Sequence, residues 1–77
     1  MKMKIEMTDT YGGEANYSWV TRKDVEFKEN ATDRQIVMAA KKALNITGVK
    51  CIKESYGDLI KLKLVNACVV VFITFDY

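Results

Sequence analysis

An apolar run near the end of the chain constrains the fold more than any other feature. Residues 67–75 contain no charged side chain and are rich in valine. A strand that is apolar on both faces belongs inside a sheet, because an exposed hydrophobic edge invites aggregation. Nine residues, most of them β-branched or aromatic, are also too few to cross a bilayer as a helix. The sequence therefore predicts a central strand over residues 68–77 and no membrane partner.

The rest of the chain divides into four further strands and one helix. Met3, Ile5 and Met7 alternate with polar residues, which predicts a first strand. A loop at residues 9–14 with a glycine pair leads to a second strand over residues 15–27, whose length predicts a bend or bulge near residues 22–24. Shorter strands are expected at residues 49–54 and 59–65.

The helix is expected to begin after Thr32, because Gln35 stands at the capping-box position three residues later. It should end near Asn45. The apolar residues recur at helical spacing, and they are Ile36, Ala39, Ala40, Ala43 and Leu44.

The element order ββαβββ predicts an α+β fold with two layers, in which one helix packs on one face of a mainly antiparallel sheet. The alternating strand directions and the central position of the last strand favour the sheet order 2-1-5-4-3. Seventy-seven residues make a single domain, residues 1–77.

The second face of this sheet has no obvious cover. Val69, Val71, Ile73 and Phe75 are expected to face the helix. The uncovered face should then carry residues of three strands, namely Val70, Phe72, Lys2, Lys4, Lys61 and Lys63. A face of this kind needs a partner, a second copy, or lysine stems lying over it.

Enzymatic chemistry has little support in the residue types present. There is no histidine, which is the commonest general base and metal ligand. Cys51 and Cys68 lack the CxxC spacing of zinc and redox motifs, and the glycine pair is not followed by a GK[ST] ending. We expect a non-enzyme without cofactor or metal, and two reduced, buried thiols in a cytoplasmic protein.

The charge distribution leaves a nucleic-acid role open as an alternative. Residues 1–33 carry five basic and seven acidic side chains, a net charge of −2, and residues 34–77 carry seven and three, a net charge of +4. The lysines of the uncovered face, with Phe72 to stack on bases, form the candidate site: Lys2, Lys4, Lys61, Lys63 and Phe72. A homodimer formed through the same face is a third hypothesis.

The segment 11–20 is the strongest candidate for a protein-binding site. It holds the only tryptophan, two of the four tyrosines and two of the four glycines. Aromatic side chains with one polar end are frequent anchors of interfaces. Trp19 has two interpretations, a core residue beside Phe27 or a contact residue. The candidate contacts, which include acidic neighbours suited to a basic partner, are Asp9, Tyr11, Glu14, Tyr17, Trp19 and Asp24.

Three segments, 8–20, 31–36 and 47–51, carry a resemblance to known proteins. They read TDTYGGEANYSWV, ATDRQI and TGVKC. Together they resemble a family of small uncharacterised proteins of tailed phages and prophages. The resemblance implies a phage accessory protein, a class that includes stoichiometric inhibitors of host defence such as anti-CRISPR proteins. Its partner would then be a host protein or defence complex in the host cytoplasm.

Overall fold

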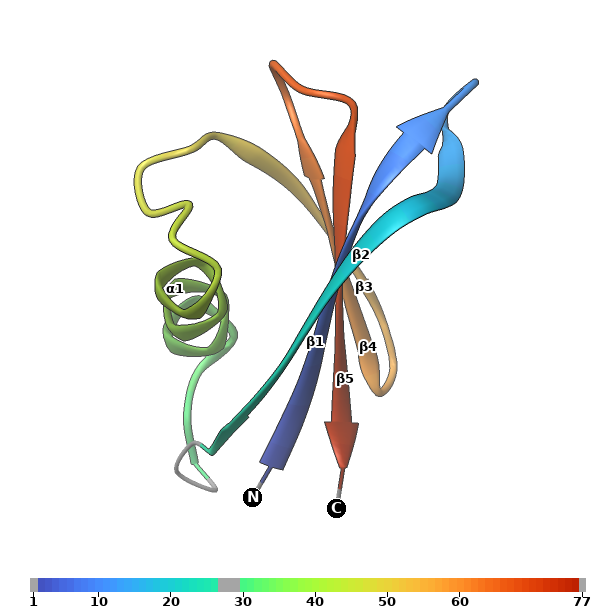
Figure 1. Cartoon of the computed structure of the whole chain (residues 1–77). Coiled ribbons are helices and arrows are strands. Elements are labelled where there is room, and N and C mark those ends of the chain that lie inside the picture. The colour runs from blue at the N-terminus through green and yellow to red at the C-terminus, as the bar shows by residue number, and fades with distance from the viewer. Residues whose placement is uncertain (1, 27–29, 77) are drawn as a thin grey trace.

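A computed structural model describes residues 2–26 and 30–76 and shows a five-stranded sheet with one helix beside it (Figure 1). Phe27, the residue predicted to end the second strand, lies outside the described residues. The elements in chain order are β1 (Lys2–Tyr11), β2 (Glu14–Glu26), α1 (Asp33–Ala43), β3 (Cys51–Tyr56), β4 (Leu59–Leu64) and β5 (Val69–Asp76).

The sheet has the order β2-β1-β5-β4-β3, and all neighbouring strands are antiparallel. The predicted α+β fold and strand order are therefore confirmed. β5 lies in the middle, between β1 and β4, because its two apolar faces both need cover. The β1–β2 turn and the β3–β4 turn lie at opposite ends of the sheet (Figure 1).

The helix begins at the predicted capping box. The Thr32 hydroxyl accepts a hydrogen bond from the Gln35 backbone N–H, and the Gln35 side chain accepts one from the Thr32 N–H. These two bonds satisfy backbone donors that have no partner within the helix. Leu44 caps the other end, and Asn45 takes a positive φ of 59° that ends the helix.

One core fills the space between α1 and one face of the sheet. The alternating residues of β1, β4 and β5 meet the apolar stripe of the helix there, as the sequence pattern predicts. Burying each large aliphatic side chain contributes about 1.5–3 kcal/mol relative to leaving it exposed. The buried members are Met3, Ile5, Ile36, Ala40, Leu44, Ile60, Leu62, Leu64, Val71 and Ile73.

Two sequence expectations about the first hairpin are wrong. β1 continues through Tyr11, so Asp9 is a strand residue instead of a loop residue. The pairing of β1 with β2 is also unbroken from Lys2↔Glu26 to Thr8↔Val20, so there is no bulge near residues 22–24. The irregularity lies between Thr8 and Thr10 instead, and the side chains that cause it form the candidate site below.

Candidate functional site

The β1–β2 hairpin closes with a two-residue turn, Gly12-Gly13. Both glycines have positive φ, 63° and 86°, as a primed hairpin turn requires. Tyr11 and Glu14 are paired on either side of the turn, and both are exposed. Tyr11 is 82% exposed, so this tyrosine makes almost no contact within the fold.

Behind the turn, β2 bulges away from β1. Between the pairs Thr8↔Val20 and Thr10↔Ala15, β1 has one residue, Asp9, while β2 has the four residues 16–19. The bulged backbone includes Tyr17 with φ 56°, a conformation in which a non-glycine residue is uncommon. Extra residues of this kind lose ladder hydrogen bonds, so other groups must satisfy their backbone.

Thr8 supplies part of that replacement. Its hydroxyl accepts a hydrogen bond from the Tyr17 N–H at 3.1 Å and lies 2.8 Å from the Trp19 carbonyl oxygen, to which it donates. The side chain of Thr8 is fully buried. One buried hydroxyl therefore replaces two ladder bonds of the bulge.

Asp9 supplies the rest. One carboxylate oxygen accepts from the Ser18 backbone N–H at 2.9 Å, and the other accepts from the Ser18 hydroxyl at 2.6 Å and from the Asn16 amide at 3.0 Å. The Ser18 and Asn16 side-chain hydrogen bonds hold the pKa of Asp9 well below its ordinary value. Asp9 is one of the predicted partner contacts, and within the fold its carboxylate positions the bulge.

The bulge directs Tyr17 over the sheet face that α1 does not cover, which we call the open face. A hydrogen bond to Glu6 on this face raises the pKa of the Tyr17 hydroxyl. Thr8 and Val70, neighbours across β1 and β5, also lie on the open face but are 0% and 1% exposed. We attribute their cover to the bulged segment, because the helix packs on the opposite face.

Trp19 is not a core residue. It is 43% exposed and does not belong to the hydrophobic cluster between α1 and the sheet. Tyr17 is 51% exposed and Val20 37%, so three neighbouring residues of one strand show large apolar surface to solvent. The name "hairpin end" is used below for Tyr11, Glu14, Tyr17, Trp19 and Val20.

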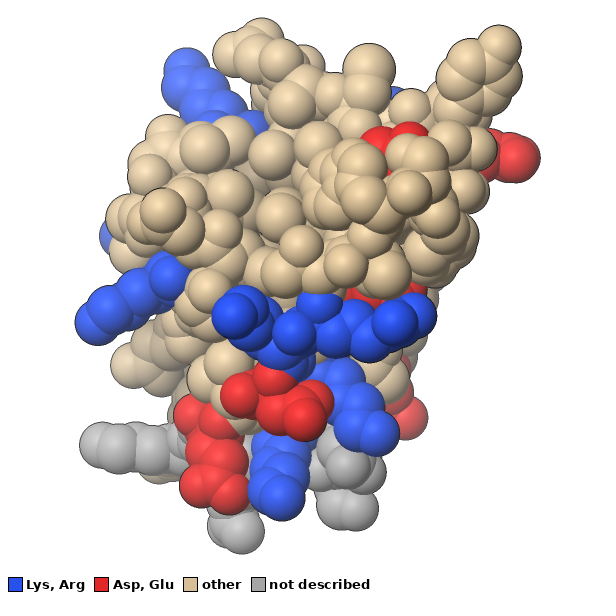
Figure 2. Space-filling view, viewed as in Figure 1, with Lys and Arg blue, Asp and Glu red and all other residues tan. Residues whose placement is uncertain are grey.

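Apart from Glu14, the residues of the hairpin end adjoin a largely uncharged part of the surface. Residues 15–21 and 64–75 contain no charged side chain. Thr10 on β1 lies between the two segments, because it pairs with Ala15 and its N–H donates a hydrogen bond to the Cys68 carbonyl. Figure 2 shows a broad band of uncharged atoms over this half, with Lys and Arg gathered below it. Val65, 53% exposed on the β4–β5 connection, adds to this apolar surface.

Asp24 lies apart from the other predicted contacts. It pairs with Lys4 on β1, seven residues from Tyr11, which corresponds to about 23 Å along a strand. Tyr11, Glu14, Tyr17 and Trp19 therefore lie at the turn and in the bulge of one hairpin, and Asp24 lies outside. Sequence reasoning missed Thr8, because a threonine at a polar position of an alternating strand carries no sign of its buried bonds.

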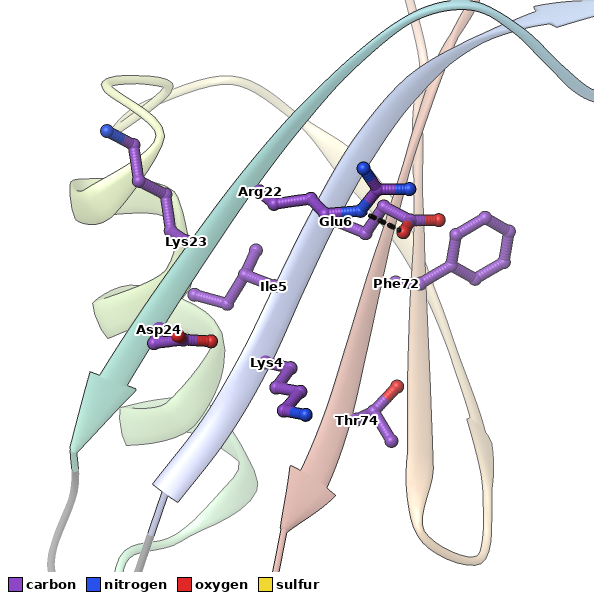
Figure 3. Close-up of a pocket in the computed structure, with 8 residues that line it drawn as sticks. All are labelled: Lys4, Ile5, Glu6, Arg22, Lys23, Asp24, Phe72 and Thr74. Atoms are coloured by element: carbon purple, nitrogen blue, oxygen red, sulfur yellow. Dashed lines mark hydrogen bonds and ion pairs between the residues drawn. The ribbon is translucent and has the colours of Figure 1, made fainter.

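The second candidate surface is the open face. Arg22 Nε lies 3.0 Å from Glu6 Oε2, and Phe72 stands beside Glu6 on the next strand (Figure 3). A hollow of about 360 Å³ opens here, and its lining comes from β1, β2 and β5: Lys4, Ile5, Glu6, Arg22, Lys23, Asp24, Phe72 and Thr74.

The predicted nucleic-acid residues share this face but do not form a basic track. Lys61 and Phe72 are cross-strand neighbours, while Lys4 and Lys63 pair with other positions of β5, and Lys2 lies beyond Lys4. Acidic side chains alternate with these cations, namely Glu6, Asp24, Glu26 and Glu54. Acidic neighbours weaken phosphate binding, which depends on accumulated positive charge.

The described residues hold no group of three or more Cys, Asp or Glu side chains placed to bind a metal ion. Both cysteines are free thiols; Cys51 is half-buried and Cys68 is exposed, so the expectation that both are buried is wrong for Cys68. Within the described ranges, no helix has the length and apolarity that a membrane span needs.

No family model, curated protein or solved structure was found to match this chain.

Proposed function

We propose that this protein acts by binding another protein through the hairpin end, as a stoichiometric inhibitor. The observation that carries the proposal is the use of Thr8 and Asp9 to hold a four-residue bulge that leaves Tyr17 and Trp19 exposed. A fold gains no core from such an arrangement, since an inward-facing tryptophan would bury more apolar area. Aromatic side chains fixed in advance lose little entropy on binding and make strong anchors.

The charges around the hairpin end favour a protein partner over a nucleic acid. Residues 5–21 contain no lysine or arginine, and they include the acidic Asp9 and Glu14. A phosphate backbone requires cations, which this segment lacks. An apolar or basic protein surface is complementary to exposed aromatics with Glu14 at their edge.

The resemblance to small phage proteins supports one class of target. We propose a host defence complex, of the kind that anti-CRISPR proteins inhibit, with another host enzyme as the wider class. Inhibition by occupancy needs only a fixed contact surface and no catalytic group.

The test compares the double variant Tyr11→Ala/Trp19→Ala with Met38→Ala, a control that removes an apolar side chain 52% exposed on α1. Each protein is expressed in bacteria that carry a CRISPR–Cas system, and plating of a targeted phage and co-purification with the effector are measured. We expect the wild type and the control to restore plating and to co-purify in a fixed ratio. The double variant should bind at least about 100-fold more weakly, since each anchor contributes about 2 kcal/mol or more.

The proposal fails if the folded double variant inhibits as the wild type does. It also fails if no defence system is inhibited and no protein partner binds in a fixed ratio.

A further inference from the structure

The open face carries an ordered row of charges around a central aromatic residue. Reading across the strands from β2 to β3, the registers place in one row Arg22, Glu6, Phe72, Lys61 and Glu54. The order of charge is therefore positive, negative, aromatic, positive, negative. If the same row from a second copy is laid over it in the opposite order, each positive side chain faces a negative one, and Phe72 faces Phe72.

We propose that the open face binds a second copy of this chain in a symmetric dimer, with the two-fold axis along β5. This rotation sets Arg22 over Glu54 of the second copy and Glu6 over Lys61 of the second copy. Every such contact occurs twice, as in any isologous interface. An axis across the strands would instead place Arg22 on Arg22 and Glu6 on Glu6, so the charges select one orientation.

The rows on either side support the same orientation. In the upper row Val20 and Ile52, 37% and 55% exposed, stand at opposite edges of the sheet and meet on reversal. In the lower row Asp24 meets Tyr56 of the second copy, whose hydroxyl donates to Glu54 of its own chain. Both apolar edge positions thus gain a partner.

The shape of the face is also complementary to itself. The hollow lies over β1, β2 and β5 and includes Asp24 and Lys4 in its lining (Figure 3). In the dimer, Asp24 faces Tyr56 of the second copy, which is 55% exposed, and Lys4 faces Leu59 of the second copy. The projecting aromatic of one copy therefore meets the hollow of the other.

The dimensions permit these contacts. Facing sheets pack about 10 Å apart at about 30°, which displaces the outermost strands by about 5 Å, within reach of Arg, Lys and Glu side chains. A face of about 24 Å by 20 Å has an area of about 500 Å². Because the bulged segment already covers Thr8 and Val70, this is an upper value for the area buried per copy, at the lower end of specific interfaces. We expect a concentration-dependent dimer with a dissociation constant on the order of 10 µM.

Two complementary variants test the proposal by sedimentation velocity over a concentration series. In the Arg22→Glu homodimer the new carboxylate faces Glu54 of the second copy. In the Glu54→Arg homodimer the new guanidinium group faces Arg22 of the second copy. Each should weaken self-association about 10- to 100-fold, since two equivalent contacts are reversed. An equal mixture should dimerise again, because the new carboxylate at position 22 meets the new guanidinium at position 54. Arg34→Glu on α1 makes the same charge change away from the face and should leave the dimer intact.

Circular dichroism establishes that each variant is folded before mixing. A wild type that stays monomeric at its highest attainable concentration overturns the proposal, and so does a mixture that fails to recover association. The hairpin end shares Val20 with this face, and Tyr17 is hydrogen-bonded to Glu6 on it. The charge variants leave Tyr11 and Trp19 unchanged, so they should lose the dimer and keep the protein partner, whereas Tyr11→Ala/Trp19→Ala should lose the partner and keep the dimer.

Discussion

The two hairpins of this sheet share a turn signal but differ behind it. In both, a tyrosine precedes a glycine with positive φ, 63° at Gly12 and 59° at Gly57. The pairing of β3 with β4 is unbroken from Cys51↔Leu64 to Tyr56↔Leu59, while β1 and β2 are separated by a four-residue bulge. The turn residues therefore do not decide whether a hairpin stays regular.

The difference lies in two side chains of β1. Thr8 and Asp9 replace the lost ladder bonds of β2 with a buried hydroxyl and a carboxylate. The corresponding positions of β3, Lys53 and Glu54, carry long side chains and offer no short polar group for such a role. A bulge that projects aromatic residues is stable only where the neighbouring strand can bind its backbone.

Thr8→Val is the change with the largest expected effect on this comparison. Valine matches the shape but leaves the Tyr17 N–H and the Trp19 carbonyl without their partner, which should lower the free energy of unfolding by about 3 kcal/mol. Urea unfolding measures the loss. Thr74→Val is the matched control, because Thr74 is exposed on the same face and should change stability by less than about 0.5 kcal/mol.

If the two valine variants are equally stable, the hydroxyl of Thr8 does not hold the bulge. A large loss accompanied by altered Trp19 fluorescence before global unfolding would show that the bulge opens as a local unit.

The contrast between the hairpins also marks the limit of prediction from sequence. Alternation, the capping box at Thr32 and the apolar run of β5 are local signals, and each led to a correct element or sheet position. The bulge depends on bonds between residues nine and eleven positions apart, which no local pattern encodes. The length of the second strand led to a bulge being expected near residues 22–24 instead of at residues 16–19, and the pattern left Trp19 unresolved between core and surface.

The glycine turns provide a second, smaller test. Gly12→Ala and Gly57→Ala should each cost about 1 kcal/mol, because alanine is strained at positive φ. At neither position would the added methyl group meet another atom within 4 Å, so backbone strain alone sets the cost. Chemical denaturation of both variants should give equal losses. A distinctly larger loss for Gly12→Ala would mean that the turn and the bulge form together.

The smallest expected effect is a difference in tyrosine titration between the hairpins. Hydrogen bonds to Glu6 and to Glu54 raise the pKa values of Tyr17 and Tyr56 above the ordinary 10.0. The contribution of these two hydrogen bonds to the free energy of unfolding is therefore full below pH 10.0. It is lost as the pH rises through the raised pKa values of the folded state. The pKa values are measured by following tyrosinate absorbance against pH in Glu6→Ala and Glu54→Ala. Tyr17→Phe and Tyr56→Phe variants assign each titration to one tyrosine. We expect each substitution to return one tyrosine toward 10.0 and leave the other unchanged. An unaltered Tyr17 in Glu6→Ala would mean that the bulge does not direct this ring over the open face.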